Sequence, residues 1–183
     1  YLAPIYTQSS TYPLQIGDDC AVIDAKDKIL TSVDSSVEEQ HFPKDLNPYY
    51  VAYRSIAVAI SDIYAMGGIP ESYLLSISHP QPSDIWFGEF SKGIEKVNQD
   101  YSLSLLGGDM VKGQLAITVT VFGKALGNIC ERANAKLGDN IFLSGPLGFG
   151  KAGLEDYQKG NKDEPSQYLM PQLISNHIIE KLN

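Results

Sequence analysis

Short apolar runs separated by polar turns predict strands along the first two thirds of the chain. These runs occupy residues 20–23, 28–33, 73–77, 103–106 and 115–122. The first two flank a polar turn and therefore predict a hairpin, whose second strand would present Asp34 at its end. The last run alternates apolar and polar side chains with the period of two that is typical of a half-buried strand.

Two longer segments predict helices. Residues 48–66 begin with a proline, follow the N-cap residue Asn47 and end before Gly67. Residues 84–99 follow Ser83, another favoured N-cap, and their apolar positions are spaced for one helix face. The order strand, strand, helix, strand, helix, strand, strand predicts an α/β (α+β) fold, with a sheet that helices cover on one face.

The apolar periodicity lapses between residues 123 and 132, which predicts a domain boundary. We expect an N-terminal domain over residues 1–126 and the beginning of an incomplete C-terminal α/β domain over residues 127–183. In the second part, residues 141–143 predict a strand and residues 151–158 a helix.

One glycine-rich segment of the second part resembles a phosphate-binding loop. Residues 145–152 nearly match the P-loop pattern, but Ala152 stands where that pattern needs a hydroxyl group to hold Mg²⁺. We therefore interpret the segment as a plain turn between a strand and a helix.

Charge and cysteine usage narrow the function classes. A formal net charge of −8 argues against non-specific binding to nucleic acid, which needs clustered Lys and Arg. No apolar run approaches the roughly 18 residues of a membrane span, so no membrane association is expected. Cys20 and Cys130 lie far apart and form no CxxC pattern, which favours a reducing, cytoplasmic setting.

The candidate chemistry of the chain lies in five aspartates: Asp18, Asp19, Asp34, Asp62 and Asp109. The last three each follow an apolar run, where a buried carboxylate is costly unless a cation or hydrogen-bond donors compensate it. Asp18 and Asp19 are adjacent like charges, which a bound cation would stabilise. Oxygen ligands alone indicate Mg²⁺, which bridges carboxylates to phosphates. The set predicts a Mg²⁺–nucleotide phosphotransfer site, whereas a single aspartate is more often a cap or turn residue.

These aspartates lie in segments that resemble one family. The matching segments are residues 16–21, Asp34 with His41 and Phe42, residues 57–67, residues 106–109 and residues 144–148. In this order and at these spacings they are similar to the thiamine-monophosphate kinase family, which is related to aminoimidazole ribonucleotide synthetase. The resemblance implies that residues 1–126 bind metal and ATP and form a homodimer through their sheet. It also implies transfer of the ATP γ-phosphoryl group to thiamine monophosphate, which gives thiamine diphosphate.

The resemblance further implies roles for individual residues. Several Mg²⁺ ions would be held by Asp19, Ser32, Asp34, Asp62 and Asp109, with Asp18 as a weaker ligand candidate. His41 would contact thiamine monophosphate, and ATP would meet Gly108, Asp109, Arg132 and Tyr101. The attacking phosphate oxygen is already anionic, so no protein residue is expected to act as a nucleophile. Without the resemblance, His41 would be interpreted as a surface or packing residue and Gly108 as a turn glycine. Arg132 would be a solvated charge and Tyr101 a core residue.

The chain also departs from the family pattern. Val33 replaces the usual Thr, Glu39 stands where Gly is common, and Met110 stands where Thr is usual. Later Asp-rich and Gly-Gly-Glu-Asp motifs are absent from these 183 residues. His79 and His177 match no family position and are expected on the surface.

Two other functions stay open at this point. One is an ATP-dependent ligase or maturation enzyme of the same superfamily. The spacing from Asp34 to His41 favours the kinase over this alternative. The other is a non-catalytic module that binds Ca²⁺ or Mg²⁺. Binding of ATP with Mg²⁺ would separate this module from the two enzymes.

Overall fold

The computed structural model describes residues 28–127, 129–143, 145–162 and 166–173. Its elements, in chain order, are β1 (Ile29–Val37), α1 (Pro48–Ala65), β2 (Gly68–His79), α2 (Asp84–Tyr101), β3 (Ser104–Lys112), β4 (Ala116–Ala125), the short 3₁₀ helix η2 (Arg132–Asn134) and α3 (Phe149–Gln158). The predicted strand at residues 20–23 lies outside the described residues. No described helix has the length and apolarity that crossing a membrane requires.

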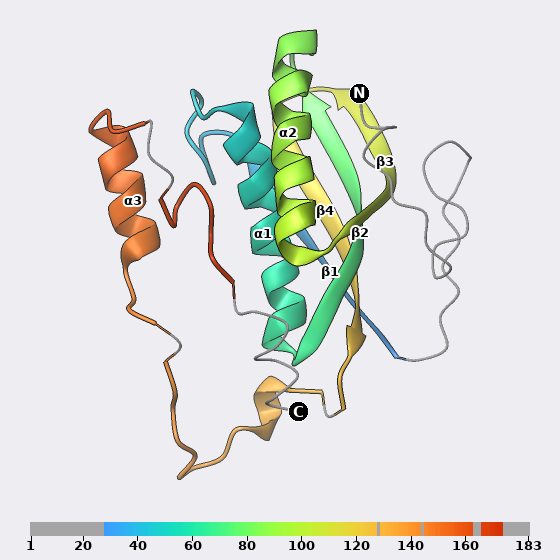
Figure 1. Cartoon of the computed structure of the whole chain (residues 1–183), viewed down its shortest axis with the longest axis vertical. Helices are drawn as coiled ribbons and strands as arrows, with labels where there is room; N and C mark the ends of the chain where they lie inside the picture. The colour runs from blue at the N-terminus through green and yellow to red at the C-terminus, as the bar shows by residue number, and fades with distance from the viewer. Residues whose placement is uncertain (1–27, 128, 144, 163–165, 174–183) are drawn as a thin grey trace.

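The strands form one mixed sheet in the order β1-β4-β2-β3. Strand β4 pairs antiparallel with both β1 and β2, and β2 pairs parallel with β3. Helix α2 connects the two parallel strands, and α1 contacts α2 and three strands. Figure 1 shows α1 and α2 side by side on one face of the sheet. The predicted fold class, a sheet that helices cover on one face, is confirmed.

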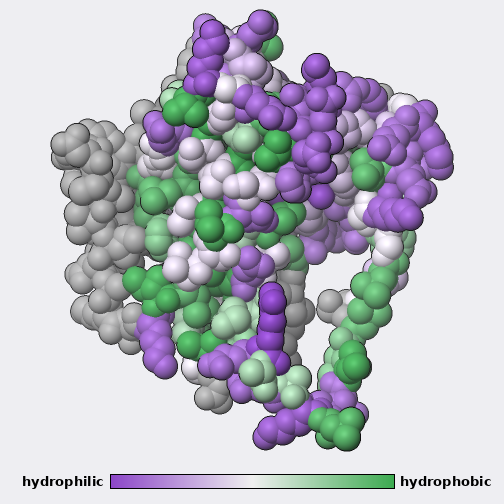
Figure 2. Space-filling model, turned by 180° about the vertical axis from the view of Figure 1, so that it is seen from behind, coloured by the Kyte–Doolittle hydropathy of each residue, from purple (hydrophilic) through white to green (hydrophobic). Residues whose placement is uncertain are grey.

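The two faces of the sheet differ in burial. In β4, Ile117, Val119 and Val121 are fully buried in the core, whereas the alternating Thr118 and Thr120 are only half-buried. Figure 2, seen from the side opposite the helices, shows hydrophobic side chains among polar ones on this second face. Large exposed hydrophobic residues of the strands are Ile29, Val33, Met110 and Val111. Helices of the described residues therefore cover the sheet on one side only.

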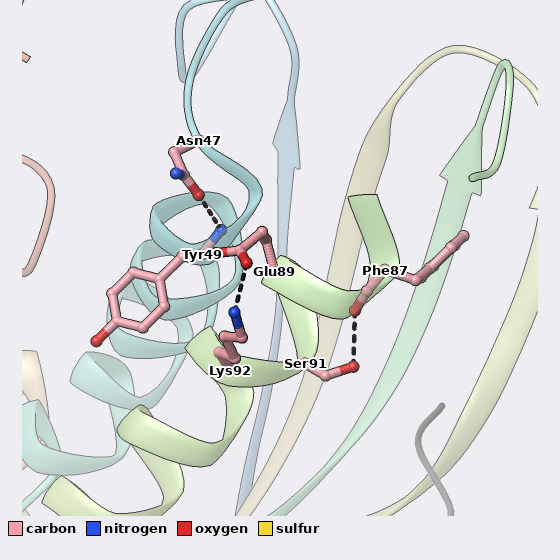
Figure 3. A network of polar contacts seen from close by, with 6 residues as sticks. All are labelled: Asn47, Tyr49, Phe87, Glu89, Ser91 and Lys92. Atoms are coloured by element: carbon pink, nitrogen blue, oxygen red, sulfur yellow. Dashed lines mark hydrogen bonds and ion pairs between the residues drawn. The ribbon is translucent and has the colours of Figure 1, made fainter. Parts of the chain in front are cut away.

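Both long helices begin where local capping chemistry predicts. The Asn47 side chain accepts a hydrogen bond from the Tyr49 amide at 2.9 Å, which caps the start of α1 (Figure 3). The Ser83 hydroxyl accepts in the same way from the Trp86 amide at 3.2 Å at the start of α2. Helix α1 ends before Gly67, whose φ of 73° lies in the left-handed region that glycine tolerates best.

Two predicted strand boundaries and one predicted strand are corrected by the structure. Strand β1 continues to Val37, so Asp34 lies inside the strand and not at its end. Strand β3 continues to Lys112, so Gly108 and Asp109 are strand residues. Residues 141–143, which lie among the described residues, form no strand. The helix predicted at residues 151–158 is present as α3. Both strands run further than the continuous apolar runs that predicted them, because pairing with neighbouring strands, not local hydrophobicity, sets their length.

His79 is buried, so the expectation of a surface position is wrong. His79 is the last residue of β2, and its exposed fraction is 9%. The imidazole packs edge-on against Trp86, with ring centroids 4.4 Å apart, and its Nδ1 accepts a hydrogen bond from the Gln81 amide. Burial lowers the pKa of His79, and the charge of Glu38 opposes this effect only in part.

This burial predicts an acid-sensitive contribution to stability. Because the folded pKa lies below 6.5, the unfolded chain binds more protons, so the contribution is complete above pH 6.5 and is lost as the pH falls below it. We expect the melting temperature of the wild type to fall between about pH 7.5 and about pH 5.5. His79→Gln should be less stable at neutral pH but show a flatter dependence. Parallel slopes in a thermal-melt pH series would contradict this role for His79.

Candidate functional site

Two of the predicted metal ligands meet near one edge of the sheet. Asp62 lies in the last turn of α1, and its Oδ2 accepts a hydrogen bond of 2.7 Å from the Ser32 hydroxyl of β1. Asp62 is exposed, so the expected burial of this carboxylate is wrong even though the helix around it is largely buried. Residues 30 positions apart in the sequence thus come into direct contact.

Asp34 lies on the same face of β1 as Ser32, because side chains two positions apart point to the same side of a strand. The register agrees: Ser32 pairs with Val121 and Asp34 with Val119, both of which are buried beneath the helices. Val33 projects to the other side and is 63% exposed. Its side chain is therefore turned away from the Ser32–Asp62 contact.

The donors at this edge are suited to a hard cation. A hydroxyl and two carboxylates are the oxygen ligands that Mg²⁺ prefers. Neither Asp34 nor Asp62 takes part in any of the ion pairs formed among the described residues. The edge therefore carries negative charge that no described basic side chain neutralises at contact distance.

The described residues do not by themselves complete a metal cluster. They contain no group of three or more His, Cys, Asp or Glu side chains arranged to hold a metal ion. Asp109 is exposed in β3, and β3 and β1 are the two outer strands of the sheet, so the two strands lie roughly 14 Å apart. Asp18 and Asp19 lie outside the described residues. The structure thus brings Ser32 into contact with Asp62, places Asp34 on the same face of β1, and leaves Asp109 on another strand.

His41 lies exposed in the loop that follows β1, and the backbone fixes its ring. The Val37 amide donates to His41 Nδ1 at 3.0 Å, while the His41 amide donates to the Val37 carbonyl at 2.8 Å. A neutral imidazole that accepts at Nδ1 carries its proton on Nε2, so it presents a donor for an anionic group. The tight turn also holds Glu39 at a φ of 64°, which explains why glycine suits this position.

The residues predicted to meet ATP have different surroundings. The Tyr101 hydroxyl donates to the Pro171 carbonyl at 3.1 Å and accepts from the Leu173 amide at 3.2 Å, and its half-buried ring lies 6.5 Å from that of Tyr64. A Cβ on Gly108 would lie 1.8 Å from the Leu75 carbonyl oxygen, so this glycine permits close strand packing and does not form a turn. Arg132 is exposed in η2. Contact of these residues with ATP stays a prediction.

One buried contact between distant residues was not predicted from the sequence. Arg54, in the middle of α1, donates from Nη1 to the Tyr168 carbonyl at 2.5 Å, and its guanidinium lies 4.2 Å from the centre of the Tyr168 ring. The sequence feature that could have indicated a buried partner for Arg54 is that it is the single charged residue in residues 48–60. Its partner lies 114 positions away, which no local pattern could identify.

Comparisons with known proteins agree with the resemblance seen in the sequence. Residues 17–125 match the family described as AIR synthase related protein, N-terminal domain. The thiamine-monophosphate kinase of Buchnera aphidicola subsp. Schizaphis graminum is 41% identical over 169 residues, which cover 91% of this chain and 50% of that protein. The crystal structure of thiamine-monophosphate kinase from Stenotrophomonas maltophilia K279a superposes with a TM-score of 0.76 at 31% identity, covering 82% of this chain and 49% of that one.

A second similar structure contains bound molecules. The complex of AaThiL with AMPPCP and TMP has a TM-score of 0.73 and 30% identity, and the match covers 90% of this chain and 55% of that one. The chain spans about half the length of the relatives and structures that it matches. The resemblance to thiamine-monophosphate kinases is confirmed, and since the match over residues 17–125 takes in more than half of the chain, the chain belongs to the family of AIR synthase related proteins.

Proposed function

We propose that the full-length protein containing this chain transfers the γ-phosphoryl group of ATP to thiamine monophosphate and forms thiamine diphosphate. The observation that carries the proposal is the contact of Ser32 with Asp62, next to Asp34, in a chain that is 41% identical to a thiamine-monophosphate kinase. The binding of AMPPCP and TMP by the similar AaThiL supports both substrates.

The reaction brings two negatively charged phosphate groups together, so their repulsion must be screened. A phosphate oxygen of thiamine monophosphate forms a bond to the γ-phosphorus, the bond from that phosphorus to the bridging oxygen breaks, and ADP leaves with the electron pair. Bound Mg²⁺ would supply the positive charge that screens the repulsion between these anions. Ser32, Asp34 and Asp62 would hold it here, and Asp19 and Asp109 are the further ligands that we propose.

The remaining residues would bind and orient the substrates. His41 presents Nε2–H to the acceptor phosphate, because its Nδ1 is occupied by the Val37 amide. Gly108, Asp109, Arg132 and the ring of Tyr101 are proposed to meet ATP. Residues 1–126 would form the metal- and ATP-binding domain, and residues 127–183 the beginning of the next domain.

We propose that the protein is a cytoplasmic homodimer. The sheet face opposite the helices carries Val33, which is 63% exposed, and the outer strand β1 has an unpaired edge among the described residues. A second copy packed against this face would bury Val33, and a strand of that copy paired alongside β1 would remove the exposed edge. Sedimentation equilibrium of the full-length protein measures the oligomeric state, and a monomer at micromolar concentration would contradict this assembly.

The function is tested by incubating the purified full-length protein with ATP, Mg²⁺ and thiamine monophosphate. Chromatography should detect thiamine diphosphate and ADP in equal amounts, and neither should form when thiamine monophosphate is omitted. Binding of ATP with Mg²⁺ without any thiamine diphosphate would instead favour the ligase, the maturation enzyme or the cation-binding module.

His41→Ala should weaken the use of thiamine monophosphate far more than that of ATP. A hydrogen bond to a charged group is worth roughly 1.5–3 kcal/mol, so kcat/KM for thiamine monophosphate should fall about ten- to a hundredfold. Steady-state kinetics with each substrate varied will measure both losses.

Two further variants separate the ligand contact of His41 from its role in the loop. Glutamine can place an N–H group near the position of Nε2, whereas asparagine can offer the Val37 amide an acceptor near the position of Nδ1. Recovery of activity in His41→Gln, and not in His41→Asn, is the expected result. The reverse order would show that His41 only holds the loop.

A further inference from the structure

A short segment after α3 packs against the N-terminal part of the molecule. We call residues 166–173 the strap; Figure 1 shows it, in red, between α3 and α1. Tyr168 and Leu169 of the strap are buried, with exposed fractions of 4% and 1%, and belong to the same hydrophobic core as α1 and the sheet. The strap is thus an integral part of the N-terminal fold although it follows the expected domain boundary.

Arg54 holds the centre of the strap by two contacts with one residue. Its Nη1 donates to the Tyr168 carbonyl at 2.5 Å, and its guanidinium stacks over the Tyr168 ring at 4.2 Å. Burial lowers the pKa of Arg54 and raises that of the Tyr168 hydroxyl, as expected for groups removed from water. A planar cation that is both hydrogen-bonded and stacked fixes the orientation of its partner ring.

The fixed Tyr168 ring directs its hydroxyl at the loop that carries His41. The hydroxyl donates to the His41 carbonyl oxygen at 3.3 Å. The same loop is held at its far end by α3, where the Tyr157 hydroxyl donates to the Asp45 carbonyl at 3.0 Å. At the other end of the strap, the Pro171 carbonyl and the Leu173 amide bond the Tyr101 hydroxyl. One segment of eight residues therefore contacts both His41 and Tyr101.

We infer that Tyr168 is a positioning residue, which, held by Arg54, fixes the His41 backbone and so the place of the His41 imidazole relative to the acceptor phosphate. The inference rests on the proposed function, because it gives His41 a substrate to meet. The His41 ring is tied to its own backbone through Val37, so a shift of the His41 carbonyl moves the ring as well.

The test is Tyr168→Phe in the full-length protein, which removes one hydroxyl and keeps the ring beneath Arg54. Loss of a single hydrogen bond should raise the KM for thiamine monophosphate about three- to tenfold, with kcat and the KM for ATP changed less than about twofold. Tyr73→Phe is the matched control, because it removes another buried hydroxyl, which is bonded to Asn98 Oδ1 of α2 and not to the loop. This control should leave the KM for thiamine monophosphate unchanged.

A second variant and a second measurement complete the test. Arg54→Lys keeps the charge but loses the planar stacking, so it should change the KM for thiamine monophosphate in the same direction as Tyr168→Phe. Amide hydrogen exchange over residues 37–42 should be faster in both variants and unchanged in Tyr73→Phe, whether or not substrate is present. The loop bonds that would open include that of the Glu39 amide to the Phe42 carbonyl, at 2.8 Å.

The outcomes separate this inference from the proposed function. An active wild type with unchanged loop exchange and unchanged KM in Tyr168→Phe would overturn the positioning role, as would equal losses for both substrates. If the wild type formed no thiamine diphosphate, the proposed function would fail. Faster loop exchange in Tyr168→Phe would then still support the contact that holds His41, and unchanged exchange would overturn it.

Discussion

Asp62→Asn should reduce the formation of thiamine diphosphate by about a hundredfold or more while the protein remains folded. Asparagine has nearly the shape of aspartate and can still accept the hydrogen bond from the Ser32 hydroxyl. What it lacks is the negative charge, which is useful at this position only when a cation is present. Initial rates at saturating ATP and thiamine monophosphate, together with thermal melts, measure the two effects.

The position of Asp62 strengthens this expectation. Asp62 lies near the C-terminal end of α1, where the helix dipole disfavours an anion by about 0.3–1 kcal/mol. Asp62→Asn should therefore leave the melting temperature unchanged or raise it slightly. An anion that costs stability and has no described basic partner is typical of a ligand position.

A matched variant controls for the loss of one surface charge. Asp156 is also exposed on a helix, and its nearest ion-pair partner, Lys159, is 4.0 Å away. Asp156→Asn should retain full activity. Equal activity in Asp62→Asn and the wild type would show that Asp62 holds no metal and serves only as a hydrogen-bond acceptor for Ser32.

Local signals explain which parts of the fold were predictable. Both long helices begin after capping residues, Asn47 and Ser83, that act within three positions along the chain. The extension of β1 through polar Ser35 and Ser36 was missed, because it depends on pairing with Thr118 and Ile117 of β4, more than 80 positions away. Such register is a tertiary property that hydrophobic periodicity does not encode.

In the candidate site, too, the residue types were predictable from the sequence but their contacts were not. The residue types and flanks of the aspartates indicated metal chemistry, but the contact between Ser32 and Asp62 depends on how α1 packs across β1. The contacts of Tyr168 with Arg54 and His41 span 114 and 127 positions. They were not predicted, since a lone arginine and a tyrosine in a polar stretch carry no local signal of each other.

Gly93→Ala should cause the largest loss of stability among single-methyl changes in α2. A Cβ at Gly93 would lie 2.1 Å from the Tyr49 carbonyl oxygen and 2.9 Å from the Ala52 Cβ, so α1 and α2 would have to move apart. Overpacking of this kind costs about 1–3 kcal/mol or more, and the higher helix propensity of alanine recovers only about 1 kcal/mol. We expect the free energy of unfolding to fall by about 2 kcal/mol.

Gly88 provides the matched control in the same helix. A Cβ there would meet no atom within 4 Å, so Gly88→Ala should raise the free energy of unfolding by about 0.5–1 kcal/mol through helix propensity alone. Urea denaturation followed by the fluorescence of Trp86, the only tryptophan of these 183 residues, reports directly on α2. The two alanines should shift the midpoint in opposite directions. If both raised it, the close approach of the two helices at Gly93 would be wrong, and the packing that places Asp62 above β1 would need revision.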